Sequence, residues 1–332
     1  MFGALKRTWI VAEIGVNHEG DEAIAADLIR KAAAAGADAV KFQTYRPETF
    51  VSATQPDRRT VVAGRMMPEG AMERLAAVAA EAGVTFFSTP LGLPDVDALN
   101  PFCPVFKIAS GEITWQALLE KVAATGKPMI VSTGGAQDHE IGRAVDIILT
   151  ARPDIIDKGE LVLMHCVSAY PTPVEEANLA NINFLADRFG VLTGYSDHTL
   201  GTKACELAVG HGAVVLEKHF TYRKEDQEFR DHALSADPDD LAALVEAVRL
   251  AEQYRGSYER QVQPSEEPVL PAMRRGLHAA MDLKAGTILE EHHLTGLRPL
   301  IGIPVEEIDR VIGQVLKTGI AEGFPISDDD LE

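Results

Sequence analysis

Two histidines, His198 and His219, are placed where they could bind one metal ion. His198 follows shortly after the apolar run 191–195, and His219 is the last residue of the run 214–219. Neutral imidazole is a common ligand of divalent first-row metals, and the ends of neighbouring strands would bring both rings over one ion. We therefore predict that His198 and His219 are metal ligands, with Asp197 and Glu217 as orienting groups or further ligands.

Two lysines, Lys41 and Lys107, lie inside apolar runs, where a buried ammonium group needs an anionic partner. One interpretation is an ion pair within the protein, with Glu13 or Glu112 as the partner. The other is an anionic substrate that carries a phosphate or a carboxylate. Hydroxyl groups near the ends of other runs, with the N–H groups of adjacent turns, would complete a phosphate-binding cradle. These hydroxyls belong to Ser110, Ser132 and Ser196.

All of these residues need a scaffold that gathers the ends of the runs at one face. Short apolar runs alternate with Ala-rich helical patterns up to about Tyr254, and runs that are apolar on both faces are typical of buried parallel strands. The runs are residues 9–14, 39–43, 85–88, 105–108, 129–132, 161–165, 191–195 and 214–219. This alternation predicts a (β/α)₈ TIM barrel, an α/β fold whose active site lies at the carboxyl ends of the strands. A doubly wound open sheet is the alternative, but no GxGxxG follows the first run.

The character of the sequence changes after Tyr254. Residues 256–271 are polar and hold Pro264, Pro268 and Pro271, which predicts a linker. Around Gly286 we expect a strand end, a turn and a second strand. The predicted parts are therefore a catalytic barrel over residues 1–255, a linker over 256–271 and a small β-rich domain over 272–332.

The chain of 332 residues has 31 Lys and Arg against 50 Asp and Glu, a formal net charge of −19. So acidic a surface repels nucleic-acid phosphates and anionic lipid headgroups, which argues against a non-specific role at either. Three cysteines are too few for a disulfide framework, and we see neither a signal peptide nor an apolar run long enough to span a bilayer. We expect a cytoplasmic protein whose active site is locally positive.

The order of these motifs resembles that of the sialic acid synthase (N-acetylneuraminate synthase) family. The opening segment VAEIGVNHEG, residues 11–20, carries the resemblance together with segments at the ends of the later runs. These are KFQT (41–44), STP (88–90), KIASGE (107–112), STG (132–134), HCVSAYPTP (165–173), GYSDHT (194–199) and EKHFT (217–221). The tail, with DLKAG (282–286) and LRP (297–299), resembles the antifreeze-like SAF domain of that family.

The resemblance implies a reaction and assigns residues to it. Phosphoenolpyruvate condenses with an N-acyl amino-sugar aldehyde to give a nonulosonic acid, and phosphate leaves by C–O cleavage. Two histidines of the family, which match His198 and His219, hold a divalent metal ion, Mn²⁺ with Mg²⁺ or Co²⁺ as alternatives. This ion acts as a Lewis acid on the sugar carbonyl. Catalytic positions match Glu13, Lys41, Lys107 and Glu112, with Glu13 handling the proton of the attacking water. Substrate contacts match Gln43, Thr89, Ser110, Ser132, Tyr170, Ser196, Asp231 and Arg298.

The resemblance also implies a domain-swapped homodimer in which the SAF domain of one subunit brings Arg298 to the sugar of the other. The alternative for Arg298 is a solvated loop charge. Segments 45–70 and 221–235 depart from the family pattern, and Ser168 stands where some members have Asn. Because these positions shape the acceptor pocket, the sugar stays open between N-acetylmannosamine and the 2,4-diacetamido hexoses that lead to legionaminic or pseudaminic acid. Two other functions stay open as well, a metal-dependent barrel aldolase or sugar isomerase and a non-catalytic carbohydrate-binding protein.

Overall fold

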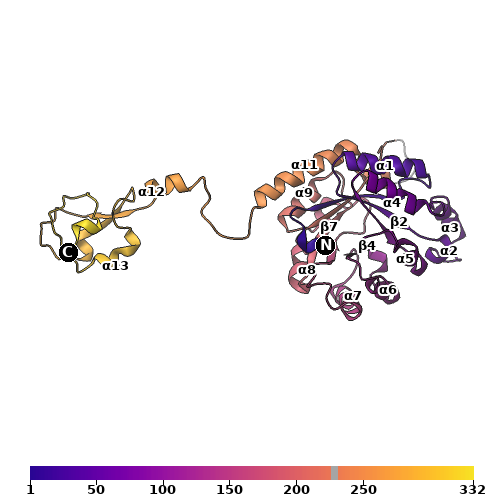
Figure 1. Ribbon diagram of the computed structural model, residues 1–332, viewed down its shortest axis with the longest axis horizontal. Coiled ribbons are helices and arrows are strands. Elements are labelled where there is room, and N and C mark those ends of the chain that lie inside the picture. The colour runs from indigo at the N-terminus through magenta and orange to yellow at the C-terminus, as the bar shows by residue number, and fades with distance from the viewer. Residues whose placement is uncertain (226–230) are drawn as a thin grey trace. The chain divides into compact units, whose positions relative to one another are not determined.

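A closed barrel of eight parallel strands forms the first unit of the protein, as the computed structural model shows (Figure 1). The structure describes residues 1–225 and 231–332. Strands pair with their neighbours in chain order, and β1 pairs with β8 to close the ring. The strands are β1 (Trp9–Gly15), β2 (Ala39–Thr44), β3 (Thr85–Pro90), β4 (Phe106–Ile108), β5 (Met129–Ser132), β6 (Leu161–His165), β7 (Leu192–Asp197) and β8 (Val215–His219). The predicted (β/α)₈ fold is confirmed.

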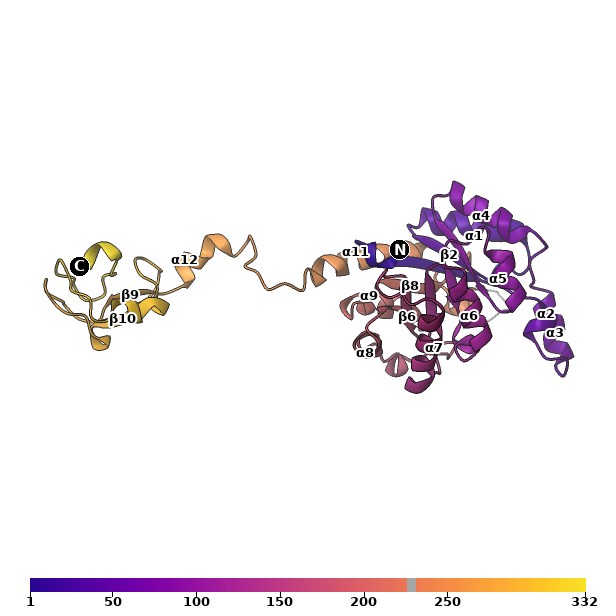
Figure 2. The same cartoon turned by 60° about the horizontal axis from the view of Figure 1, so that its bottom comes forward.

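Helices between the strands form an outer layer around the barrel (Figure 2). Asp21 caps α1 by accepting hydrogen bonds from the N–H groups of Ala23 and Ile24. The helices of this unit are α1 (Glu22–Ala34), α2 (Pro47–Phe50), α3 (Pro56–Ala63), α4 (Ala71–Glu81), α5 (Leu93–Leu99), α6 (Gln116–Ala124), α7 (Asp138–Ala151), α8 (Asn181–Phe189), α9 (Lys203–Gly210), α10 (Asp231–Leu234) and α11 (Pro238–Arg255). Within the described ranges no helix combines the length and the apolar character that crossing a membrane requires.

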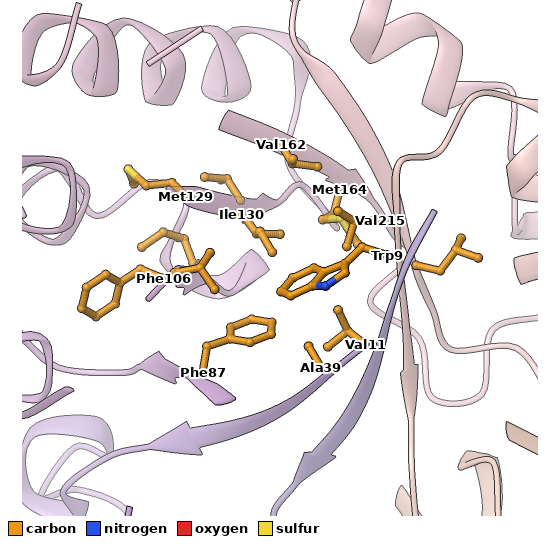
Figure 3. Close-up of a cluster of buried hydrophobic side chains, with 14 of the residues drawn as sticks. Trp9, Val11, Ala39, Phe87, Phe106, Met129, Ile130, Val162, Met164 and Val215 are labelled. Carbon is orange, nitrogen blue, oxygen red and sulfur yellow. The ribbon is translucent and has the colours of Figure 1, made fainter. Parts of the chain in front are cut away.

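The barrel interior changes from apolar to charged along the strands. Alternate residues of a strand face the same side, so Trp9, Val11 and Glu13 of β1 point the same way. Trp9 and Val11 lie in an apolar cluster with Phe87 and Met164 (Figure 3), and the indole of Trp9 stacks on the Phe87 ring with centroids 5.6 Å apart. This cluster fills the barrel interior on the side of Glu13 away from the carboxyl ends of the strands, and that part of the interior is apolar.

A second compact unit covers Ser257–Glu332, and the barrel unit covers Met1–Gly256. The second unit contains α12 (Leu270–Met273), β9 (Gly276–Ala279), β10 (Leu294–Leu297) and α13 (Ile308–Val311). Strands β9 and β10 pair antiparallel. The unit has an apolar core of its own, formed by Leu277, Ala279, Leu283, Leu289, Leu294, Ile303, Val311, Leu316, Ile320 and Ile326.

The segment around Gly286 differs in part from the expectation. A turn does form there, with the φ of Gly286 at +80°, in the left-handed region that glycine enters without a steric cost. The flanking residues Leu283 and Ile288 form isolated β-bridges rather than strands. Residues 257–271, which lie within the predicted linker, belong to the second unit and include the first two residues of α12.

Candidate active site

A polar cavity of about 250 Å³ opens at the carboxyl ends of the barrel strands. All but two of the predicted site residues line it, although they come from the eight strands or the segments that follow them. They are Glu13, Lys41, Gln43, Thr89, Lys107, Ser110, Glu112, Ser132, Tyr170, Ser196, His198 and His219. The structure therefore brings these residues together at one place.

Four buried charged side chains occupy the centre of the cavity. Lys41 Nζ lies 2.9 Å from Glu13 Oε2 and 3.5 Å from Glu217 Oε1. Lys107 Nζ lies 2.6 Å from Glu217 Oε2. The sequence interpretation paired the lysines with Glu13 or Glu112, and this is right for Lys41 and Glu13. Lys107 instead pairs with Glu217, which stands 110 residues away along the chain.

The two lysines differ in how well their charge is compensated. Burial lowers the pKa of Lys107, because its attraction to Glu217 and the weaker attraction to Glu13 do not offset the loss of water and the like charge of Lys41. Burial has the same tendency at Lys41, but Glu13 and Glu217 together outweigh it and raise the pKa of this lysine. Lys107 is therefore the cation that would gain more from an additional anion.

The two glutamates are shifted in opposite directions. Burial raises the pKa of Glu13, with repulsion from Glu217 adding to it and attraction to Lys41 opposing it. At Glu217 burial also disfavours the charge, but Lys107 and Lys41 outweigh it and lower the pKa. Two carboxyl groups whose pKa values are shifted in opposite directions suit different roles, because Glu13 can hold a proton while Glu217 stays ionised.

A second part of the cavity gathers small polar groups around Gly134, just beyond β5. The N–H of Gly134 donates to Ser110 Oγ at 3.0 Å, and Ser110 Oγ lies 3.3 Å from Cys166 Sγ. A Cβ at position 134 would meet Ser168 Oγ at 2.5 Å and Ser110 Oγ at 2.9 Å. Only glycine lets these hydroxyls approach so closely, and such a cluster of donors is suited to anion oxygens.

His198 and His219 lie side by side, with ring centroids 5.5 Å apart. The ring of Tyr170 packs on His198 at 4.1 Å between centroids and meets His219 edge-on at 6.0 Å. His198 Nδ1 is 2.7 Å from the carbonyl oxygen of Val167. Because a carbonyl only accepts, Nδ1 carries the hydrogen, which leaves the lone pair on Nε2.

Both imidazoles are held in the neutral form that binds metals. Burial lowers the pKa of His198 and of His219, and for His219 the neighbouring His198 and Lys41 lower it further. Among the described residues no group of three His, Cys, Asp or Glu side chains is arranged to hold a metal ion. The pair therefore fits an ion that takes two ligands from the described part of the protein and the others from substrate or water.

Glu112, Gln43 and Tyr170 line the same cavity. Burial raises the pKa of Glu112 to about 7, so this carboxyl keeps a proton at a higher pH than an exposed glutamate does. Gln43 Nε2 donates to Glu13 Oε1 at 3.0 Å, which fixes the orientation of that carboxyl group. Burial raises the pKa of the Tyr170 phenol, and the nearby thiol of Cys166 and carboxylate of Asp231 raise it further.

The remaining two predicted site residues lie elsewhere. Asp231 is the first residue of α10 and does not line the cavity, although its charge acts on Tyr170. Arg298 belongs to the second unit, where it follows β10 directly and is exposed. Of segment 221–235, residues 226–230 lie outside the described residues.

Glu217 is the cavity residue that sequence reasoning undervalued, since it was predicted only as an orienting group or a metal ligand. It binds both lysines and accepts a hydrogen bond from Ser196 Oγ at 3.1 Å. Its position two residues before His219 was the available signal, because strand residues two apart share a face. Asp197 was predicted in the same role, but it pairs with Lys218 at 2.8 Å, away from the cavity.

The protein is a (β/α)₈ barrel whose cavity, at the carboxyl ends of the strands, is lined by lysines, carboxylates and histidines. Residues 28–260 match the model of the NeuB family, and residues 274–332 match the SAF domain. The chain is 36% identical to an N,N'-diacetyllegionaminic acid synthase of Legionella pneumophila, over 97% of this chain and 94% of that protein. It is 32% identical to a pseudaminic acid synthase of Campylobacter jejuni, over 99% of this chain and 98% of that protein.

A solved structure gives the same assignment. The N-acetylneuraminic acid synthetase of Leptospira borgpetersenii, crystallised with citrate, aligns with a TM-score of 0.74 and 33% identity, over 79% of this chain and 90% of that one. The chain belongs to the NeuB family and carries a C-terminal SAF domain. The resemblance that the motifs indicated is thereby confirmed.

Proposed function

We propose that the protein is a nonulosonate synthase. It condenses phosphoenolpyruvate with an N-acyl amino-sugar aldehyde to a nonulosonic acid and phosphate. The observation that carries the proposal is one cavity that holds two buried lysines, a hydroxyl cluster around Gly134 and two neutral histidines. The family membership and the names of its relatives support the same reaction class.

Phosphoenolpyruvate binds to the cationic part of the cavity in this proposal. Lys107 and Lys41 neutralise its phosphate and carboxylate, with Thr89, which accepts a hydrogen bond from Lys41 at 3.2 Å, beside them. Ser110 accepts from the N–H of Gly134, so its own hydroxyl hydrogen can turn to a phosphate oxygen. The hydroxyl groups of Ser132 and Ser196 line the same region.

Glu13 manages a proton in the proposed reaction. C3 of phosphoenolpyruvate forms the new bond to the sugar carbonyl carbon, water adds at C2, and the C–O bond to phosphate breaks. Glu13 takes the proton of that water. Its raised pKa and its fixed orientation between Lys41 and Gln43 suit a group that accepts a proton and holds it.

His198 and His219 would hold a divalent cation, for which we propose Mn²⁺, with Mg²⁺ or Co²⁺ as alternatives. When bound, the ion supplies Lewis-acid activation of the sugar carbonyl. The tautomer of His198, set by its hydrogen bond to Val167, leaves Nε2 able to coordinate.

The acceptor is an N-acyl hexosamine bound on the side of Glu112, Gln43 and Tyr170, with Asp231 near Tyr170. The candidate substrates are N-acetylmannosamine and the 2,4-diacetamido hexoses, and the second class is supported by relatives named as legionaminic and pseudaminic acid synthases. We further propose a domain-swapped homodimer in which Arg298 of one copy reaches the sugar in the other.

A panel of acceptor sugars tests the reaction. Purified protein with Mn²⁺ and phosphoenolpyruvate is given N-acetylmannosamine, a 2,4-diacetamido hexose or a sugar phosphate, and released phosphate and product mass are measured. We expect phosphate and nonulosonic acid in equal amounts with at least one N-acyl hexosamine. Isomerised or cleaved sugar without consumption of phosphoenolpyruvate would establish an isomerase or aldolase. Tight sugar binding without turnover would establish a binding protein.

A further inference from the structure

Asp197 and Lys218 form a fully buried ion pair behind the cavity. They lie opposite each other on β7 and β8, and the preceding pair in the register, Ser196 and Glu217, lines the cavity. Side chains alternate along a strand, so Asp197 and Lys218 point the other way, toward α9. Cys205 on that helix donates its thiol hydrogen to Asp197 at 3.5 Å. The exposed fraction is 0% for Asp197 and 1% for Lys218.

This pair fixes the backbone on the far side of His198. Lys218 Nζ donates to Asp197 Oδ2 at 2.8 Å and to the carbonyl oxygen of Thr199 at 2.6 Å. Asp197 Oδ1 accepts from the N–H of Thr199 at 2.9 Å. Both backbone polar groups of Thr199 are thus held by the ion pair, and the residue between Asp197 and Thr199 is His198.

His198 is also held on its other groups. Its carbonyl oxygen accepts from the N–H of Thr172 at 2.9 Å, and its Nδ1 donates to the carbonyl oxygen of Val167 at 2.7 Å. The orientation of the His198 ring therefore depends on the position of the backbone of residues 197–199, because a displaced backbone would move Nδ1 away from the carbonyl oxygen of Val167. His219 directly follows Lys218, so the same pair ties the two histidines to each other.

A buried ion pair is an expensive way to fill the space between a strand and a helix, because both ions lose their water. Apolar side chains of similar size would pack there without that cost. They would not, however, hydrogen-bond the N–H and the carbonyl group of Thr199. The chemistry of the pair therefore matches a task at the backbone beside His198 rather than packing alone.

We infer that Asp197 and Lys218 are positioning residues that fix His198, and its spacing to His219, for metal binding. This inference rests on the proposed function, which makes the two histidines the metal ligands. Neither residue lines the cavity, so neither would touch the metal, and their hydrogen bonds to Thr199 connect them to His198.

The test compares two variants of the full chain. Asp197→Asn/Lys218→Met removes both charges at once, so that no lone buried ion is left. The asparagine still offers an oxygen that accepts from the N–H of Thr199, but the carbonyl oxygen of Thr199 loses the hydrogen bond from Lys218. Val209→Ala is the control, because Val209 is a buried apolar residue of α9 that lies four residues after Cys205 and therefore on the same face of the helix. Mn²⁺ alone is titrated calorimetrically into metal-free protein, and ¹⁵N NMR of the histidine rings reports the tautomer of His198.

We expect the double variant to bind Mn²⁺ at least about ten-fold more weakly, as for other groups that orient a ligand. Its His198 should also lose the uniform Nδ1–H tautomer in the metal-free state. Val209→Ala should keep the affinity and the tautomer of the unaltered protein. Equal effects of the two variants, or an unchanged affinity and tautomer in the double variant, would overturn the inference alone. An unaltered protein that binds no Mn²⁺ would overturn the metal assignment and the inference with it.

Discussion

Each lysine in the cavity has a carboxylate partner, and the two partnerships are unequal. Lys41 is shared between Glu13 and Glu217, whereas Lys107 contacts Glu217. An anion that enters competes with these carboxylates for the lysines and raises the pKa of Glu13 beyond the increase that burial already causes, which makes its carboxylate a stronger base. Substrate binding would therefore prepare Glu13 for proton transfer.

His219→Ala tests the metal at the scale of one residue. Because one of two imidazole ligands is lost, we expect Mn²⁺ affinity to fall by more than the roughly 100-fold that is the upper end for groups that only orient a ligand. Phosphate release should become undetectable, and the circular dichroism spectrum should be unchanged. The control is His211→Ala, a half-buried histidine at the C-cap of α9 that does not line the cavity. Normal turnover of His219→Ala would refute the assignment.

Glu112→Gln tests whether the raised pKa of the Glu112 carboxyl makes the stability of the protein depend on pH. Below the ordinary pKa of 4.5 the group is neutral in the folded and unfolded chain, so it has no effect on relative stability. As the pH rises from there through about 7, the unfolded chain ionises first, and the folded protein loses stability. Above pH 7 the variant should therefore melt at a higher temperature than the unaltered protein.

Thermal melts at about pH 4 and about pH 8 check this expectation, since the difference should be absent at the lower pH. The control is Glu120→Gln on α6, an exposed glutamate that does not line the cavity. A difference of equal size at both pH values would show that the amide stabilises the protein for another reason.

At the scale of elements, the turn after β5 determines the shape of the anion-binding part of the cavity. In Gly134→Ala the new methyl group would displace the hydroxyls of Ser110 and Ser168, which lie 2.9 and 2.5 Å from the added Cβ. We expect the KM for phosphoenolpyruvate to rise by about ten-fold, and stability to fall by about 1–3 kcal/mol from overpacking.

Gly135→Ala is the matched control for this turn. Gly135 has a φ of +74° and open space around its Cβ position, so alanine there strains the backbone without touching the hydroxyls. Steady-state kinetics and urea unfolding of both variants separate the two effects. A KM that rises equally in both would mean that loop strain, not crowding of the hydroxyls, controls phosphoenolpyruvate binding.

At the scale of the whole molecule, the chain consists of two units with separate cores. A chain that ends at Gly256 should therefore fold and keep the melting temperature of the barrel. If Arg298 acts on the sugar from a second copy, this truncation should impair sugar use far more than phosphoenolpyruvate use.

Arg298→Ala in the full chain isolates that arginine. Loss of a charge-assisted hydrogen bond of about 1.5–3 kcal/mol predicts a KM for the sugar that rises by roughly 10–100-fold, with the KM for phosphoenolpyruvate nearly unchanged. Arg310→Ala is the control, because Arg310 is exposed and paired with Glu307 and Asp328 within its own domain. Equal kinetics of the two variants would reject the proposed role of Arg298.

The acidic composition also belongs to this scale. The formal net charge is −19, yet the cavity holds Lys41, Lys107 and two neutral histidines beside its carboxylates. Net charge thus describes the surface and its solubility, while the cavity sets its own local field.

The sequence by itself determined the barrel and the residues gathered at its carboxyl ends. Apolar runs separated by helical patterns fix the strand order, and the end of a run fixes which residues lie at the active face. That reasoning needs only local pattern, so it placed Lys41, His198 and His219 correctly in one cavity.

Only the tertiary structure decided which charges meet. Lys107 and Glu217 come from β4 and β8, and their contact depends on how the strands are staggered around a closed barrel. Asp197 and Glu217 both lie near histidines in the sequence, yet one faces the helices and the other the cavity. A shift of one residue in the phase of a strand exchanges these faces, and the only local signal for the phase was the distance of each carboxylate from a histidine of the site.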